Sequence, residues 1–169
     1  MKIFTNAQIA TLAGNDSFGM IAQGVIVVEG RKIAWLGTAK DLPDVYQSGE
    51  TVNLEGRLVT PALIDCHSHI VFGGNRATEF EQRLNGASYE EVAKAGGGIV
   101  STVTATRLAS DSALLADALT RVDAMIAEGV TMIEVKSGYG LDTETELKML
   151  RVARQIATLR MVDIKTTFL

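Results

Sequence analysis

The sequence predicts an α/β protein in which a β-rich N-terminal zone is followed by a parallel sheet covered by helices. Two observations support this fold class. From Met1 to about Gly56, short apolar runs alternate with turn residues, which is typical of small sheets. From about Leu58 the pattern changes to strand, loop and helix in repetition, which is typical of a parallel sheet with helices outside it. We therefore expect two domains, residues 1–57 and 58–169.

Strand-like runs in the N-terminal zone lie at Gly24–Gly30 and Lys32–Gly37. The stretch Glu29-Gly30-Arg31 between them indicates a tight hairpin connection. Roughly 55 residues form only a thin core. We therefore expect this zone to be part of a small β-sandwich that strands from elsewhere complete.

The second zone is expected to contain three strands, at Leu58–Val71, Val130–Lys136 and Val162–Leu169. Pro61 stands near the start of the first strand, where a missing N–H does least harm. Because helical patterns separate these strands, the strands should be parallel and the helices should cover their faces.

Helix signals lie between the expected strands. Ser88 and Glu91 have the spacing of a capping box at the start of one helix. A longer helix should run from about Ser112 to Glu128 and stop at Gly129, and another should begin at Asp142 or Thr143. The apolar faces of these two helices are expected to include Leu115, Leu119, Val122 and Ile126 in one, and Leu147, Leu150 and Ile156 in the other.

Composition and charge exclude several functional classes. Hydrophobic residues make up 47% of the chain and charged residues 21%, as in globular proteins. The net charge is −4, and the scattered lysines and arginines form no basic patch for nucleic acid. Cys66 is the only cysteine, which excludes an intrachain disulfide. The sequence shows neither a signal peptide nor a run of about 18 apolar residues, so we expect a cytoplasmic protein that does not bind membranes.

The two histidines, His67 and His69, stand two positions apart at the end of an apolar run. On a strand, such positions share a face, so both imidazoles should project the same way with Asp65 one step below them. The alternate residues should face the helix layer: Ile64, Cys66 and Ser68. We therefore expect the Cys66 thiol to be buried and inert.

Two neutral imidazoles side by side on one strand form half of a metal site. The alternative is a chance pair of polar residues near a strand end. The apolar run before the pair favours metal ligation by His67 and His69, because imidazoles without partners at the end of a buried strand would be costly.

A resemblance to a known family begins at this motif. The stretch Pro61–His69 resembles the first-strand metal motif of the amidohydrolase superfamily, and further stretches resemble the imidazolonepropionase family within it. These stretches are Val71–Arg76, Gly86–Glu91, Ala95–Ile99 and Glu134–Leu141. The resemblance extends from Leu58 to Leu169. It implies the first part of a (β/α)8 barrel, with an N-terminal β segment that joins C-terminal strands in a small sandwich.

The resemblance also implies an activity. Imidazolonepropionases hydrolyse the cyclic amide of 4-imidazolone-5-propanoate to N-formimidoyl-L-glutamate in histidine degradation. One divalent zinc or iron ion is implied, with His67 and His69 as two of its ligands. The remaining ligands and the acid/base residue are expected beyond residue 169, so we expect the isolated chain to be an inactive and poorly stable N-terminal portion. A homodimer of the full-length enzyme is compatible with the resemblance.

Arg76 and Tyr139 each follow an expected strand, where barrel enzymes build their active sites. A guanidinium is suited to bidentate capture of a carboxylate, although a solvated surface arginine would fit the same spacing. A tyrosine between glycines can reach a ligand or anchor its own loop. The resemblance assigns Arg76 to the propanoate tail of the substrate and Tyr139 to substrate contact.

Other polar residues are interpreted structurally. Glu134 with Lys136, and Asp163 with Lys165, are expected to form a polar layer inside the barrel, because charges within strands need partners or water. The glycines at 96–98 lack the lysine of a phosphate-binding loop and predict a flexible loop near the site. Two other functions remain open: a different cyclic amidase or deaminase of the superfamily, and a non-enzymatic fragment.

Overall fold

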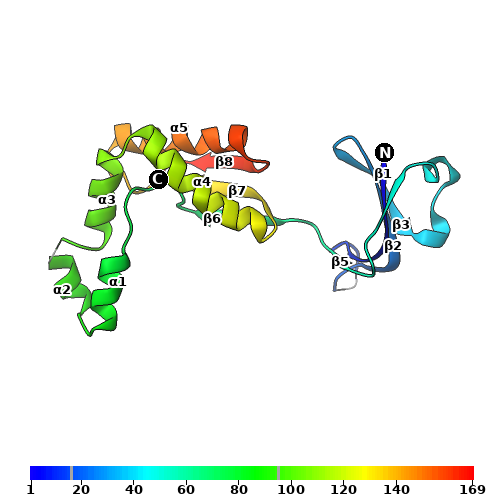
Figure 1. Cartoon of the computed structure of the whole chain (residues 1–169), viewed down its shortest axis with the longest axis horizontal. Coiled ribbons are helices and arrows are strands. Elements are labelled where there is room, and N and C mark those ends of the chain that lie inside the picture. The colour runs from blue at the N-terminus through cyan, green and yellow to red at the C-terminus, as the bar shows by residue number, and fades with distance from the viewer. Residues whose placement is uncertain (16, 95) are drawn as a thin grey trace. The chain divides into compact units, whose positions relative to one another are not determined.

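The computed structural model describes residues 1–15, 17–94 and 96–169 (Figure 1). It divides into two compact units, Met1–Pro61 and Ala62–Leu169, so the division falls after Pro61 rather than after residue 57. Ala95, which belongs to one of the family-like stretches, lies outside the described residues.

The first unit is a mixed sheet centred on its first strand. That strand, β1, pairs antiparallel with β2, and β2 pairs antiparallel with β3. On its other side, β1 pairs in parallel with β4 and β5. The strands span Lys2–Ala10 (β1), Met20–Glu29 (β2), Lys32–Thr38 (β3), Glu50–Asn53 (β4) and Leu58–Val59 (β5). Two short 3₁₀ helices follow β3, at Ala39–Asp41 and Asp44–Tyr46.

The expected hairpin between β2 and β3 is confirmed. Glu29 pairs with Lys32, which leaves Gly30 and Arg31 as a two-residue loop. Gly30 has a φ of 58°, a left-handed conformation that costs glycine little because it has no Cβ. The core of this unit is small, as expected: its buried cluster consists of Ile3, Val25 and Val27, with Trp35, Leu42 and Tyr46 packed against it.

The second unit contains a parallel sheet of strand order β6-β7-β8 within its described residues. These strands span Leu63–Ser68 (β6), Val130–Lys136 (β7) and Asp163–Thr167 (β8). The prediction of one strand over Leu58–Val71 is wrong in its extent. Leu58 and Val59 pair with β1 of the first unit, and the chain leaves the sheet pattern at Thr60–Ala62, where Pro61 cannot donate to a ladder.

Five helices are described in the second unit. They span Ala77–Leu84 (α1), Tyr89–Lys94 (α2), Ile99–Leu108 (α3), Asp111–Ala127 (α4) and Thr143–Leu159 (α5). Figure 1 shows α4 and α5 alongside the sheet, whereas α1 and α2 lie at the end of an arm that α3 leads to. Among the described residues, no helix has the length and apolar character needed to cross a membrane.

The predicted helix ends are confirmed by their hydrogen bonds. Glu91 N–H donates to Ser88 Oγ over 3.2 Å, and Ser88 N–H donates to Glu91 Oε2 over 2.7 Å, which is the expected capping box. Asp142 Oδ1 accepts from the N–H of Thr145 at the start of α5 over 2.8 Å. The segment after α4 turns at Gly129, where φ is 95°.

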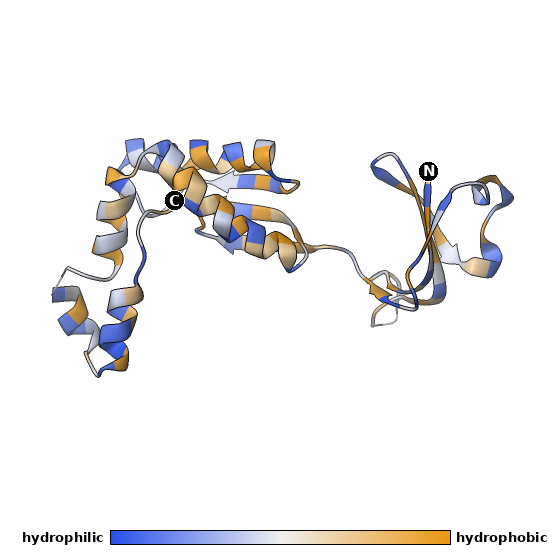
Figure 2. Ribbon diagram, in the orientation of Figure 1, coloured by the Kyte–Doolittle hydropathy of each residue, from blue (hydrophilic) through white to orange (hydrophobic). Residues whose placement is uncertain are grey.

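The main core lies between the sheet and helices α4 and α5, and Figure 2 shows α4 as more apolar than the largely hydrophilic α1. The predicted helix faces are only partly right. On α4 the fully buried residues are Leu114, Ala118 and Val122, whereas Leu115, Leu119 and Ile126 are partly buried. On α5, Leu150 and Ile156 are buried as expected, but Leu147 is exposed. The apolar stripe of each helix therefore meets the core along one edge.

Leu114 provides a test of this core. Its side chain is fully buried, so Leu114→Ala should leave a cavity and lower the free energy of unfolding by about 2–5 kcal/mol. Leu108→Ala is the matched control, because Leu108 at the end of α3 is 82% exposed, and its effect should stay below about 0.5 kcal/mol. Urea denaturation measures both values. Equal losses in the two variants would contradict the assignment of Leu114 to the core.

Candidate functional site

The histidine pair lies at the carboxyl end of β6, where the pairing with β7 is irregular. Asp65 pairs with Ile133 and Ser68 pairs with Val135, so β6 carries one more residue than β7 over this stretch. Such a bulge shifts the side chains that follow it to the other face. Ile133 and Val135 are buried in the core under the helices.

This bulge makes the prediction for Asp65 wrong. Asp65 lies on the helix side with Ser68, whose Oγ donates to Asp65 Oδ1 over 2.8 Å. The same carboxylate oxygen accepts from the backbone N–H of His67 over 3.0 Å. Asp65 therefore holds the backbone of the bulge and does not stand below the imidazoles on their own face.

The two imidazoles are neighbours. The ring centroids of His67 and His69 are 5.4 Å apart, and the ring planes are tilted by 53°. Two imidazoles that bind one tetrahedral ion through nitrogen at about 2 Å have ring centres on the order of 5 Å apart, so this spacing fits a shared ion. Nδ1 of His69 is buried and has no hydrogen-bond partner in the described part of the chain. An unsatisfied buried imidazole nitrogen is costly, which is consistent with a missing partner at this site.

The histidine pair provides only part of a metal site. Among residues 1–15, 17–94 and 96–169, no group of three or more His, Cys, Asp or Glu side chains could hold a metal ion. A catalytic zinc ion normally takes three protein ligands and a water. His67 and His69 thus fit two positions of such a coordination sphere.

The expectation that Cys66 is a buried thiol is wrong, because Cys66 is exposed. Cys66 is exposed because α4 and α5 pack mainly against β7 and β8, so β6 at the sheet edge receives little cover from them. Ile64, which was also expected to face the helices, is 65% exposed. It precedes Asp65 on the strand and pairs with Met132, so its side chain lies on the face opposite to the helices.

A polar layer beside the histidines is confirmed for one of the two expected pairs. Glu134 Oε1 accepts from Lys136 Nζ over 2.5 Å and from Thr167 Oγ1 over 2.6 Å. The hydrogen bond from Lys136, then that from Thr167, lowers the pKa of Glu134, and His67 contributes a smaller favourable charge. The second expected pair, Asp163 and Lys165, is exposed and forms no ion pair within the described residues.

Tyr139 connects the histidines to the loop after β6. Its ring meets the His69 ring edge-on at a centroid distance of 5.7 Å and the Phe72 ring at 5.6 Å. The guanidinium carbon of Arg121 lies 3.6 Å from the centre of the Phe72 ring, a cation–π contact. A continuous series of rings therefore leads from the histidine pair to an arginine on α4.

Arg76 and Tyr139, the two residues assigned to substrate contact, line one cavity of about 440 Å³. This volume lies within the range of small-molecule sites. Arg76 is exposed, and its Nε donates to Thr102 Oγ1 on α3 over 3.0 Å. The other lining residues are Phe72, Gly74, Asn75, Thr102 and Arg121. None of the lining residues is acidic, so two guanidinium groups make the cavity suited to an anion.

Arg121 was not identified from the sequence. Its Nη1 donates to the backbone oxygens of Ile70 over 2.9 Å and Phe72 over 3.1 Å, which ties α4 to the segment after β6. Burial lowers the pKa of Arg121 and the charge of Asp117 opposes this, yet an arginine remains protonated at neutral pH. The available signal was the four-residue spacing of Asp117 and Arg121, which is also typical of a solvated helix surface.

Glu79 on α1 fixes the arm that carries Arg76. Its carboxylate accepts from the backbone N–H of Gly98 over 2.8 Å and from Ser101 Oγ over 2.7 Å, at the start of α3. The hydrogen bond from Ser101 is the largest cause that lowers the pKa of Glu79, followed by that from Gly98, with a smaller effect of the Arg76 charge. Gly98 also lines a cavity with Arg76, so the glycine loop lies near the candidate site as expected.

Comparison with known proteins gives a specific sequence match. The chain is 72% identical over 167 residues to an imidazolonepropionase of Roseobacter denitrificans, covering 99% of this chain and 42% of that protein. It is 57% identical to an imidazolonepropionase of Paracoccus denitrificans, covering 100% of this chain and 42% of that protein. The chain thus spans about two fifths of the length of these relatives. No protein-family profile matches it. The resemblance to imidazolonepropionases expected from the sequence motifs is confirmed.

Solved structures share the fold at low sequence identity. An ochratoxinase from A. niger matches with a TM-score of 0.60 at 18% identity, over 99% of this chain and 30% of that chain. A guanine deaminase from C. acetobutylicum with bound guanine matches with a TM-score of 0.52 at 16% identity, over 99% of this chain and 45% of that chain. The chain therefore shares the mixed α/β fold of these two enzymes over nearly its whole length.

The contacts of Glu79 generate a prediction about acid stability. A carboxyl whose pKa is lowered by folding adds stability above its unfolded pKa, and this stability is lost as pH falls through the folded pKa. Glu79→Gln should therefore reduce stability at neutral pH and flatten the loss of stability on acidification. The measurement is the free energy of unfolding in urea from about pH 7 to about pH 3.

The control for this prediction is Glu81→Gln. Glu81 lies on the same helix, is exposed, and its side chain makes no hydrogen bond or ion pair in the described part of the chain. Its pH dependence should match that of the unaltered protein. If the free energy of unfolding depended on pH in the same way for Glu79→Gln and the unaltered protein, the stabilising role of Glu79 would be contradicted.

Proposed function

We propose that the protein containing this sequence is an imidazolonepropionase, which hydrolyses 4-imidazolone-5-propanoate to N-formimidoyl-L-glutamate in histidine degradation. The observation that carries this proposal is that Arg76 and Tyr139 line one cavity and that the ring of Tyr139 contacts that of His69. The 72% identity to an imidazolonepropionase supports it. Because the chain spans about two fifths of the relatives' length, the proposal concerns a protein of their full length that contains this sequence, hereafter the full-length protein.

The proposed substrate has a flat ring and a carboxylate tail. Arg76 binds the tail. Its Nε donates to Thr102 Oγ1, which orients the guanidinium plane, and its two terminal nitrogens can then form a bidentate pair with a carboxylate. Arg121 adds positive charge to the cavity wall, while its contacts with Ile70 and Phe72 hold it in place. With no acidic lining residue, the cavity favours an anionic tail over a cationic one.

Tyr139 lies between the tail site and the histidine pair. Its ring packs edge-on against both Phe72 and His69, so the substrate ring can lie against it with the reacting amide near the imidazoles. In the reaction, an oxygen from water bonds to the ring carbonyl carbon, the ring C–N bond breaks, and the departing nitrogen takes up a proton. Binding at Arg76 and Tyr139 orients the amide for this attack.

A divalent zinc or iron ion held by His67 and His69 would supply a bound water of lowered pKa and polarisation of the ring carbonyl. The 5.4 Å ring spacing and the unpartnered Nδ1 of His69 support a ligand role for the pair. Glu134, held as a carboxylate by Lys136 and Thr167, belongs to the polar layer beside His67. A relative in structure, an atrazine chlorohydrolase from Arthrobacter aurescens, was solved in complex with zinc.

We also propose the architecture of the full-length protein. The parallel strands β6, β7 and β8 represent the first strands of a (β/α)8 barrel, with the first unit as the N-terminal part of a composite β-sandwich. Two observations support this: the site residues follow the carboxyl ends of parallel strands, and amidohydrolase structures match 99% of the chain.

The substrate assignment is tested by Arg76→Ala in the full-length protein. Loss of a charge-assisted bidentate contact is worth roughly 2 kcal/mol or more, so KM for 4-imidazolone-5-propanoate should rise about 30-fold with metal content unchanged. Arg151→Ala is the control, because Arg151 is exposed on α5 and is not among the residues that line the cavity. An unchanged KM for Arg76→Ala would return Arg76 to the role of a solvated surface arginine.

Metal ligation is tested without any activity assay. His67→Ala and His69→Ala should each lower the metal retained by the full-length protein at least about tenfold after dialysis against a weak chelator, because a coordination position is lost. Elemental analysis gives the bound zinc and iron. Full metal retention in both variants would exclude the pair as ligands, whereas loss in the Arg76→Ala control would indicate a general effect on folding.

A further inference from the structure

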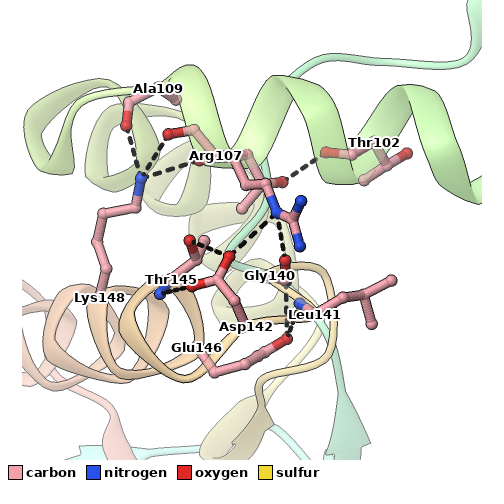
Figure 3. A network of polar contacts seen from close by, with 10 residues as sticks. Thr102, Arg107, Ala109, Gly140, Leu141, Asp142, Thr145, Glu146 and Lys148 are labelled. Carbon is pink, nitrogen blue, oxygen red and sulfur yellow. Dashed lines mark hydrogen bonds and ion pairs between the residues drawn. The ribbon is translucent and has the colours of Figure 1, made fainter.

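The loop that carries Tyr139 is held by the carboxylate of Glu146 on α5. Glu146 Oε2 accepts from the N–H of Gly138 over 2.6 Å, and Oε1 accepts from the N–H groups of Gly140 and Leu141, both over 2.7 Å. Glu146 is only 3% exposed. Figure 3 shows its side chain beneath the backbone of Gly140 and Leu141.

We propose that Glu146 is a positioning residue that holds Tyr139 in place for contact with the substrate, an inference that rests on the proposed function. Three backbone donors on one buried carboxylate form charge-assisted bonds, which offset the cost of removing the charge from water. The bonds flank Tyr139 on both sides, at Gly138 and at Gly140. The carboxylate therefore sets the path of the backbone at this residue.

The backbone of this loop needs such support. Gly138 has a φ of 136° and Leu141 a φ of 54°, and the left-handed region is unfavourable for a leucine. The N–H of Leu141 is one of the three donors to Glu146. Loss of the carboxylate would leave a strained conformation without one of the interactions that maintain it.

A second contact holds the loop from the opposite side. Arg107 Nε on α3 donates to the backbone oxygen of Gly140 over 2.7 Å and lies 3.1 Å from Asp142 Oδ2. Lys148 Nζ donates to three backbone oxygens at the end of α3, those of Thr106, Arg107 and Ala109. Figure 3 shows these contacts joining α3, the loop and α5. The loop is thus held between two helices.

The position of this loop also determines the surroundings of His69. A Cβ added at Gly138 would lie 3.2 Å from Cε1 of the His69 ring, so the loop backbone passes directly beside that ring. Tyr139 meets the same ring at a centroid distance of 5.7 Å. A shift of the loop would therefore move Tyr139 away from the proposed substrate position.

The test is Glu146→Gln in the full-length protein, assayed with 4-imidazolone-5-propanoate. The side-chain oxygen of glutamine can still accept hydrogen bonds, but its NH2 group is a donor and would face at least one backbone N–H without forming a hydrogen bond. KM should rise about tenfold while kcat per bound metal changes less than about threefold. Glu144→Gln is the matched control, since Glu144 is exposed on the first turn of the same helix, and it should leave KM unchanged.

A double-mutant cycle separates positioning from a general structural role. If Glu146 acts through Tyr139, Glu146→Gln should change KM less than about twofold in a Tyr139→Ala background, because the two effects are not additive. Equal effects of Glu146→Gln in both backgrounds would overturn the proposal, as would an unchanged KM in the single variant. If Glu146→Gln does not fold, Arg107→Met takes its place, because it removes the contact with Gly140 from the other side. The criterion is the same: Arg107→Met should raise KM in the otherwise unaltered protein and change it less than about twofold in the Tyr139→Ala background.

Hydrogen exchange distinguishes failure of this inference from failure of the proposed function. Amide exchange at Gly138, Gly140 and Leu141 should be faster in Glu146→Gln than in Glu144→Gln, whether or not the imidazolone is the substrate. Unchanged exchange at these three amides would overturn the positioning role. An unaltered full-length protein that does not hydrolyse the imidazolone would overturn the proposed function, and with it the substrate part of this inference.

Discussion

Parallel pairing of β7 with β6 and β8 is the constraint on which the candidate site depends. Parallel strands end at the same edge of a sheet, so residues that follow different strands meet there although helices separate them in the sequence. His69 follows β6 and Tyr139 follows β7, and their rings are in contact. Thr167 at the end of β8 reaches Glu134 of β7 and completes the polar layer beside the histidines. Each strand thus contributes to the same small region.

Charged side chains near this edge bind backbone groups, and in doing so they shape the site. Arg121 donates to the carbonyls of Ile70 and Phe72, which fixes the segment after β6. Glu146 accepts from the amides around Tyr139, which fixes the segment after β7. A buried charge is costly unless it is hydrogen-bonded, so these contacts both stabilise the charges and restrict the loops. The arginine also adds the positive charge that suits the cavity to an anion.

Much of the fold could be predicted because its signals are local. The capping box of Ser88 and Glu91, and the cap at Asp142, depend on residues three positions apart and form as expected. Helix faces were harder to predict, and Leu147 is exposed although it has the spacing of a core residue. A stripe of apolar residues defines which side of a helix is hydrophobic, but the packing partner decides which edge of that stripe is buried.

The sequence by itself determined the candidate site residues: the spacing of His67 and His69, and the placement of Arg76 and Tyr139 after strands. Only the tertiary structure decided how these residues meet and what supports them. The bulge in β6 turned Asp65 to the helix side, and the edge position of β6 left Cys66 exposed. The roles of Arg121 and Glu146 arise from contacts that cross between strands and helices. Such contacts depend on register and packing between segments far apart in the chain, which no local pattern of residues specifies.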